Sequence, residues 1–402
     1  MTGAPWRRLL QFGVLQLVAA ISPVLVLPVV VAQVGEHGWV GLSIGYGIGA
    51  AAAIMVALAW PVVGPSLVAI ESPNVRAAYY LESVRTRTYC FVATSTVASV
   101  AAAMLAPDGA RGLAVAMAIA MASWGLTPSW YFVGVGNPRG ILNFETLPRL
   151  AASLMAIPFV HFTGVAYFYP TLVLLGSLLP VTLAHRMLVP RGQATVAPPG
   201  ASDRLRTNVA LALSSVVGAG YTSLAVPLAS ASGLQVGAVS SLASAFRIKT
   251  LGQFGTNSVT TALQGWVPDD DDGRAARKRV TASVLVVICG AISAVALAVV
   301  APWIAEVLFG DVAPVDRQLA MALAAGALPV ALSATLAFHW LVPLGQVREV
   351  AAARIAGTVI GVPLIVLAAR TSGASAVMWA MNAAEVVVCL WCLNALKRRY
   401  NS

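Results

Sequence analysis

Long runs of apolar residues alternate along the whole chain with short polar segments that contain Arg, Lys, Gly and Pro. A helix needs about 20 residues to cross the roughly 30 Å of a bilayer's hydrocarbon core. The pattern therefore predicts an all-α polytopic membrane protein with twelve transmembrane helices. They lie near 9–32, 40–62, 88–106, 112–134, 142–162, 167–188, 207–229, 236–262, 281–303, 319–341, 351–370 and 374–396.

The run 236–262 is more polar than the others and carries Arg247 and Lys249 near its middle. Each charge at a helix centre costs about 2.5–3.5 kcal/mol on insertion scales. If this run crosses the bilayer, most of the 25 Lys and Arg fall on one side, among them Arg87 in the loop between the second and third spans. If it does not, the cations divide almost evenly. The positive-inside rule favours the crossing and places both termini in the cytoplasm.

Composition supports a membrane protein, since 59% of the residues are hydrophobic and only 10% are charged, against about 25% charged in soluble proteins. The net charge of +10 lies in short loops, where it orients the chain and contacts anionic lipids, so we expect no nucleic-acid partner. We read 9–31 as the first span and not as a cleaved signal peptide. The histidines show no metal-ligand spacing, and we expect no cofactor.

A stretch rich in Pro, Gly and Ala, residues 190–204, predicts a cytoplasmic linker between an N-terminal six-helix lobe (1–189) and a C-terminal six-helix lobe (205–402). Residues 25–28 and 224–227, late in the first and seventh spans, have similar sequences that end in proline. They suggest a parallel repeat. Glycines 41, 45 and 49 recur every four residues and predict close packing of the second span against a neighbour.

Arg247 and Lys249 are the first candidate functional residues. Two positions apart on a helix, they are separated by about 200° and cannot both point at one spot. They either line a cavity for an anionic ligand or take part in structural pairing. Glu385 lies deep in the last apolar run. It is either a proton or sodium site or the structural partner of Arg354 or Lys249.

Glu145 and Arg149 open the fifth apolar run four residues apart, with the acid first. This spacing stabilises a helix by a few tenths of a kcal/mol. The pair is either a surface ion pair at the cytoplasmic end of the helix, or Arg149 contacts a phosphate as a substrate enters.

Three segments and the twelve-span layout carry a family resemblance. The segments are VAAISPVLVLPVVVAQVGEHGWVGLSIG (18–45), TPSWYFVGVGNPRGILNFETLPRL (127–150) and ASAFRIKTLGQF (243–254). The chain resembles the Wzx-type flippases of O-antigen and exopolysaccharide repeat units. They belong to the multidrug/oligosaccharidyl-lipid/polysaccharide exporter (MOP) superfamily.

This resemblance implies a MATE/MOP-like fold with a V-shaped central cavity that opens alternately to each side. The implied substrate is an undecaprenyl-diphosphate-linked oligosaccharide, moved to the outer leaflet of the bacterial inner membrane. Arg247 and Lys249 would bind its diphosphate, with Arg149 and Arg139 at the cytoplasmic entrance. The implied partners are membrane lipids, a coupling ion and other polysaccharide-assembly membrane proteins.

Two alternatives belong to other functional classes. A small-molecule or multidrug exporter of the same superfamily is the first, although an exporter of cationic drugs would place acids in the first lobe, and the first four spans contain none. A membrane enzyme is the second, but it needs a sizeable outer loop with catalytic side chains, and the outer loops here are short. We therefore expect a transporter.

Overall fold

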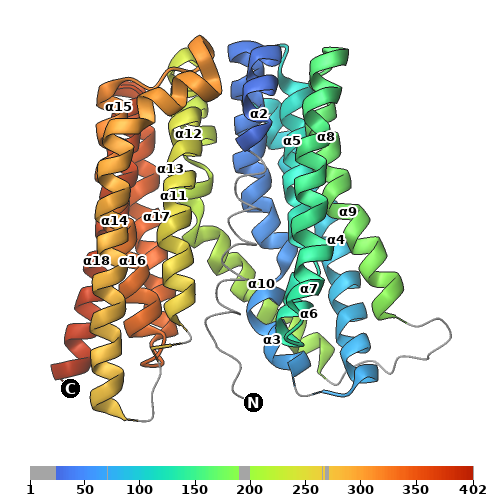
Figure 1. Ribbon diagram of the computed structural model, residues 1–402, viewed down its shortest axis with the longest axis vertical. Helices are drawn as coiled ribbons and strands as arrows, with labels where there is room; N and C mark the ends of the chain where they lie inside the picture. Colours follow the sequence, from blue (N-terminus) through green and yellow to red (C-terminus); the bar gives the residue numbers. More distant parts are fainter. Residues whose placement is uncertain (1–23, 70, 190–199, 265, 268–270, 402) are drawn as a thin grey trace. The chain divides into compact units, whose positions relative to one another are not determined.

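The computed structural model describes residues 24–401, apart from residues 70, 190–199, 265 and 268–270. In this part of the chain helices follow one another through short turns, without strands (Figure 1). The described residues form two compact units, which divide between Val216 and Val217. The prediction of a linker at 190–204 falls largely outside the described residues, and the two six-helix lobes stay a prediction.

The unit that ends at Val216 consists of helices joined by two short non-α turns. They are α2 (Leu27–Ala57), α3 (Trp60–Ala69), α4 (Pro73–Leu105), α5 (Arg111–Ala122), the 3-10 turn η1 (Ser123–Leu126), α6 (Ser129–Gly134), α7 (Pro138–Ile141), the π-helical turn η2 (Leu142–Thr146), α8 (Leu147–Thr163), α9 (Phe168–Leu188) and most of α10 (Ala201–Gly218). The amino-terminal part of the first predicted span, 9–23, lies outside the described residues.

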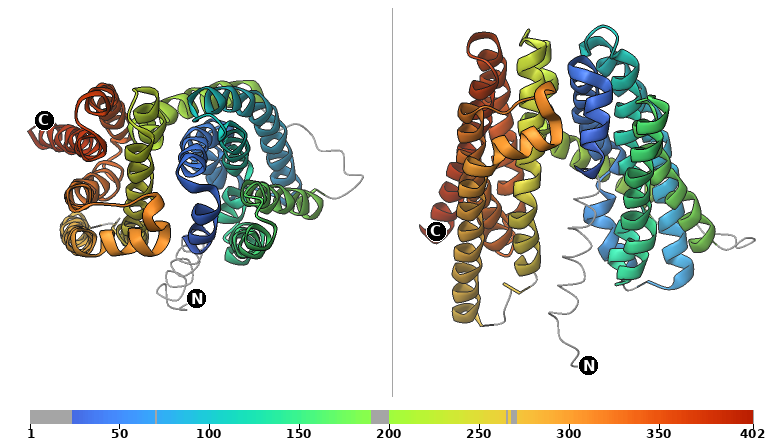
Figure 2. Two further views of the ribbon diagram at one scale, coloured as in Figure 1. Left: turned by 90° about the horizontal axis from the view of Figure 1, so that it is seen from above. Right: turned by 45° about the horizontal axis from the view of Figure 1, so that its top comes forward.

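The second unit begins within the last turn of α10. Its further helices are α11 (Gly220–Ser223), α12 (Ala225–Ala231), α13 (Val236–Gln264), α14 (Asp272–Phe309), the 3-10 turn η3 (Gly310–Val312), α15 (Arg317–Ala325), α16 (Ala327–Thr335), the π-helical turn η4 (Leu336–Leu341), α17 (Val347–Thr371) and α18 (Ala374–Asn401). The last two pack side by side (Figures 1 and 2).

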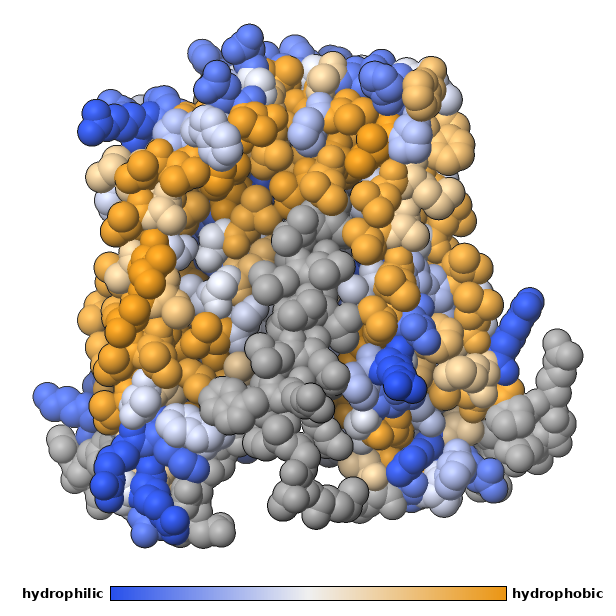
Figure 3. Space-filling model, viewed as in Figure 1, coloured by the Kyte–Doolittle hydropathy of each residue, from blue (hydrophilic) through white to orange (hydrophobic). Residues whose placement is uncertain are grey.

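Eight helical segments among the described residues are long and apolar enough to cross a membrane. Helix also occupies the other predicted spans from residue 40 onward. Of these, α8 has only 17 residues, and α13 has 29 residues but carries several polar side chains. On the face shown in Figure 3, apolar residues fill the middle of each unit and hydrophilic residues gather toward its ends. An apolar middle with polar ends is what a bilayer requires.

Helix α2 joins the end of the first predicted span, 9–32, to the start of the second, 40–62. The helix is broken at Gly35, where φ is +62°, a left-handed conformation that glycine adopts without steric cost. Beyond this break, Gly41, Gly45 and Gly49 lie against the backbone of α5. A Cβ atom at Gly45 would come within 2.2 Å of the Ala114 carbonyl oxygen. The predicted packing role of these glycines is confirmed.

We expect Gly45→Ala to lower the thermal stability of the purified protein, because the added methyl group forces α2 away from α5 at a cost of about 1–3 kcal/mol. The matched control is Gly255→Ala in α13, where nothing lies within 4 Å of the added Cβ. Melting curves in detergent measure the difference, and equal melting of the two variants would contradict the close contact.

Candidate functional site

The polar helix α13 packs against α12, α14, α15, α16 and α18 within the second unit. Its two cations are in different environments. Lys249 is buried, with an exposed fraction of 7%, whereas Arg247 is half-buried. The difference agrees with the separation of about 200° around the helix.

Glu385 of α18 is also buried, with 6% of its surface exposed. It attracts the Lys249 ammonium electrostatically, although the described residues contain no ion pair or direct hydrogen bond of Lys249. Glu385 thus lies near one of the two basic residues named from the sequence as structural partners. Whether it also binds a coupling ion stays a hypothesis.

Two hydroxyl groups bind the Glu385 carboxylate. The Tyr221 hydroxyl of α11 donates to Oε2, and Ser333 Oγ of α16 hydrogen-bonds to Oε1. Helices α11, α16 and α18 therefore meet at one carboxylate. We call Lys249, Glu385, Tyr221 and Ser333 the buried charge cluster.

Sequence reasoning missed Tyr221 and Ser333, because single hydroxyl residues are common in apolar helices and usually bond to their own backbone. Ser333 Oγ is also 3.0 Å from the Val330 carbonyl oxygen. The one local signal is the pair Gly218 and Gly220 beside Tyr221, where the helix is interrupted between α10 and α11.

A second polar cluster in the same unit surrounds His339. Its Nδ1 lies 3.0 Å from Thr335 Oγ1, and its Nε2 lies 3.2 Å from the Thr260 carbonyl oxygen. Thr335 donates to Ser283 Oγ at 2.9 Å. The ring of His339, in η4, is thus hydrogen-bonded to α16 and α13, and Thr335 connects the cluster to α14. In the part of the chain that the structure describes, no group of three or more His, Cys, Asp or Glu could hold a metal.

In the first unit, the one that ends at Val216, the guanidinium of Arg149 lies over an aromatic ring. Its Nη1 lies 2.9 Å from Glu145 Oε1, and its guanidinium carbon lies 4.3 Å from the centre of the Trp124 ring. Only 18% of the Arg149 side chain and 20% of the Glu145 side chain are exposed. Arg139, in α7, is exposed. The pair is more buried than an ordinary surface pair, and a role at the substrate entrance stays a hypothesis for both arginines.

Arg87 corrects the sequence analysis, which placed it in a loop. Helix α4 begins at Pro73, so Arg87 lies within it and is 1% exposed. Its guanidinium donates to the carbonyl oxygens of Ser83, Gly125 and Thr127 at 3.3, 3.0 and 2.9 Å. The last two carbonyls belong to the break between α5 and α6, where the helical bonding pattern stops. Arg87 therefore satisfies the backbone of this interrupted span.

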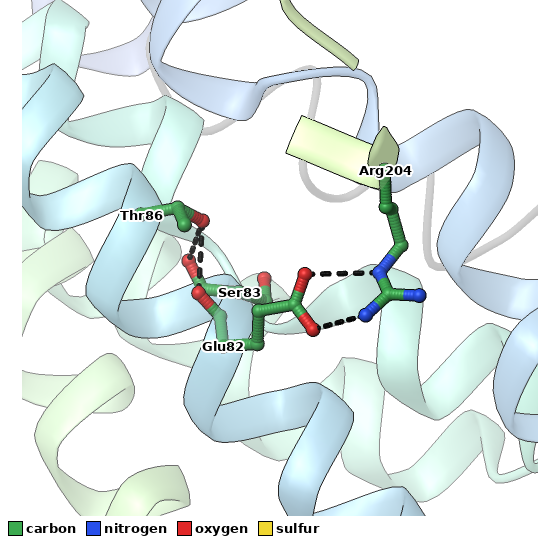
Figure 4. Close-up of polar contacts among 4 residues, drawn as sticks. All are labelled: Glu82, Ser83, Thr86 and Arg204. Carbon is green, nitrogen blue, oxygen red and sulfur yellow. Dashed lines mark hydrogen bonds and ion pairs between the residues drawn. The ribbon is translucent and has the colours of Figure 1, made fainter. Parts of the chain in front are cut away.

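Arg204, at the start of α10, forms a bidentate ion pair with Glu82 of α4 (Figure 4). The two N–O distances are 2.9 and 2.5 Å, and the side chains are 14% and 11% exposed. The guanidinium also lies 5.0 Å from the centre of the Tyr79 ring. The hydrogen bond with Glu82 raises the pKa of Arg204 above its ordinary value. This contact explains why the first part of α10 belongs to the first unit.

Comparison with known proteins identifies the fold. Three solved structures illustrate the likeness. An inward-facing MATE multidrug transporter of the MOP superfamily superposes with a TM-score of 0.72, at 15% identity over 95% of this chain and 96% of the other. The lipid II flippase MurJ in an inward closed conformation superposes with a TM-score of 0.74, at 14% identity over 96% and 87%. The chain has a MATE-like fold.

The third solved structure is a MOP superfamily transporter from Pyrococcus furiosus Vc1, with a TM-score of 0.52, 15% identity and coverage of 98% and 96%. For that transporter, a reversed polarity of the binding pocket suggests a different function. No protein-family model and no curated protein sequence matches the chain. The similarity is therefore one of fold, shared with transporters of different substrates.

Replacing Arg87 by methionine should lower the free energy of unfolding by about 3 kcal/mol, since it leaves buried carbonyl groups at Gly125 and Thr127 without a donor. The control is Arg85→Met on the same helix, where the side chain is exposed. Unfolding in detergent mixtures measures both. Equal stability of the two variants would show that other donors replace the guanidinium.

A double-mutant cycle of Glu82→Gln and Arg204→Gln should give a coupling energy of about 1–2 kcal/mol, because both side chains are mostly shielded from water. The comparison pair is Asp108 and Arg111, which is 2.8 Å apart but 92% and 63% exposed. It should couple measurably less, since water and salt screen exposed charges. Similar coupling in the two pairs would contradict the role of burial.

Proposed function

We propose that the protein is a flippase that moves an undecaprenyl-diphosphate-linked oligosaccharide repeat unit from the cytoplasmic to the outer leaflet of the bacterial inner membrane. The MATE-like fold supports a transporter, and the three solved structures described above are transporters. One of them is a lipid II flippase. A lipid-linked oligosaccharide belongs to the same broad class of substrate.

The observation that carries this proposal is the pair of cations in α13. A membrane protein places charge within a transmembrane helix where the charge has a functional or structural partner. Lys249 has no direct ion pair or hydrogen bond among the described residues, which leaves its ammonium donors available to an anion. We propose that Arg247 and Lys249 bind the diphosphate, whose oxygens accept strong charge-assisted hydrogen bonds.

Arg149 and Arg139 are proposed as the cations of the cytoplasmic entrance. Arg139 is exposed and can meet a phosphate in solution. Arg149 is held by Glu145 and Trp124, which fixes the direction of its guanidinium.

We further propose that Glu385 takes part in coupling to an ion, and that other polysaccharide-assembly membrane proteins deliver the substrate and receive it. The pathway would be that of O-antigen or a related polysaccharide.

Export of a small molecule or drug is the second candidate, and the fold of a MATE multidrug transporter supports it. The two functions differ in the charge that the site must accept. A cationic drug requires unpaired acids, whereas the Glu385 carboxylate is engaged by Tyr221 and Ser333. The arrangement therefore favours an anionic substrate.

Translocation in proteoliposomes tests the proposal. A fluorescent polyprenyl-diphosphate oligosaccharide is placed in both leaflets, and a membrane-impermeant reductant reports the outer fraction. We expect transport by the wild type and a rate about tenfold lower for Arg247→Ala and for Lys249→Ala, which corresponds to one lost charge-assisted bond. Arg370→Ala, which removes an exposed cation at the end of α17, is the control and should transport normally.

A wild-type protein that extrudes a cationic dye and leaves the diphosphate lipid in place would overturn the flippase in favour of the drug exporter. Normal transport by both α13 variants would retain the flippase but remove these two residues from its substrate site.

A further inference from the structure

Lys249 is in an unusual position for a lysine. Its surface is 7% exposed, yet it has no ion pair or hydrogen bond among the described residues. A buried ammonium without a direct partner is strongly unfavourable unless a nearby charge offsets the loss of hydration. The nearby charge is Glu385, which attracts Lys249 through space.

Helix α13, which carries Lys249, packs against α18, which carries Glu385, so the carboxylate is the acid to compare with a direct partner of the ammonium. Instead, Tyr221 binds Oε2 and Ser333 binds Oε1. The hydroxyl donors come from two other helices and are themselves buried, with 1% and 2% of their residues exposed. Hydrogen bonds in such an apolar surrounding are strong and fix the orientation of the groups that they join.

A direct ion pair would stabilise the charge of Lys249 and would also occupy its N–H donors. Here the first effect occurs without the second. The acid lies on a helix that packs against α13, and its negative charge offsets part of the cost of burying the charge of Lys249. The three N–H donors of the ammonium are nevertheless not taken by that acid. An ammonium with a distant counter-charge can bind phosphate oxygens without first breaking an internal ion pair.

We infer that Tyr221 and Ser333 are positioning residues of the anion site at Lys249. They hold the Glu385 carboxylate away from the ammonium and so keep its donors available to the diphosphate of the substrate. This inference rests on the proposed function and adds residues on α11 and α16 to a site proposed from α13 alone. Neither hydroxyl touches the substrate, and both act through Glu385.

Binding to undecaprenyl diphosphate in nanodiscs tests the inference, with undecaprenol as the uncharged reference. Tyr221→Phe frees Oε2 of Glu385, which then pairs with Lys249 and competes with the ligand. We expect the affinity for the diphosphate to fall about tenfold, the equivalent of one hydrogen bond to a charged group. Ser333→Ala frees Oε1 and should act in the same direction, and Ser333→Thr should restore binding.

The deciding measurement combines Tyr221→Phe with Glu385→Gln. Without a carboxylate there is nothing for the tyrosine to hold, so the double variant should bind as well as Glu385→Gln alone. A loss of affinity that persists in the Glu385→Gln background would come from packing and would overturn the inference. Tyr80→Phe is the matched control, since it removes a buried hydroxyl that has no hydrogen-bond partner, and it should bind like the wild type.

The outcomes separate the two proposals. A wild type that binds undecaprenyl diphosphate no better than undecaprenol overturns the proposed function. A wild type that prefers the diphosphate, loses it on Lys249→Ala and keeps it on both Tyr221→Phe and Ser333→Ala overturns only the positioning role. Melting curves of each variant identify a loss of folding. If Tyr221→Phe does not fold, Ser333→Ala and its threonine rescue decide the question.

Discussion

The cost of placing charge in an apolar surrounding governs this structure. Membrane-spanning helices expose apolar side chains to lipid, so each buried charge needs a partner inside the protein. Lys249 and Glu385 provide the clearest case, because the two charges lie near each other without a direct bond. The hydroxyls of Tyr221 and Ser333 complete the arrangement.

The first unit meets the same constraint in another way. Arg87 has no carboxylate beside it among the ion pairs of the described residues, and it is solvated by three backbone carbonyl groups. The carbonyls of Gly125 and Thr127 are available because the helix is interrupted between α5 and α6. The buried guanidinium thus receives acceptors, and the carbonyl groups of the interrupted helix receive a donor. By contrast, Arg204 and Glu82 form a direct bidentate pair, which joins the start of α10 to α4.

These three solutions suit different roles. A buried ion pair, or a guanidinium bound by backbone carbonyls, holds helices together and has fewer donors left for a ligand. A cation stabilised from a distance retains its donors. This physical difference is the reason why we propose an anion site on α13, whereas the contacts of Arg87 and Arg204 join helices. The MATE-like fold is shared by transporters of drugs and of lipids, so the chemistry of such sites, and not the fold, decides the substrate.

The sequence by itself determined the membrane class and the all-helical architecture, since apolar runs of membrane-span length and the distribution of Lys and Arg follow from the cost of polar groups in lipid. It also identified the glycine packing in α2 and the charged residues of α13 and α18.

Only the tertiary structure decided which groups meet. Arg87 was assigned to a loop because an arginine just before an apolar run resembles an orientation signal, and two of the three carbonyls that bind it come from residues about 40 positions later. Ser333 gave no signal and Tyr221 only that of the neighbouring glycines, because their partner Glu385 lies 52 and 164 residues away. Contacts of this kind depend on how helices pack, and packing is set by the whole unit and not by any local pattern.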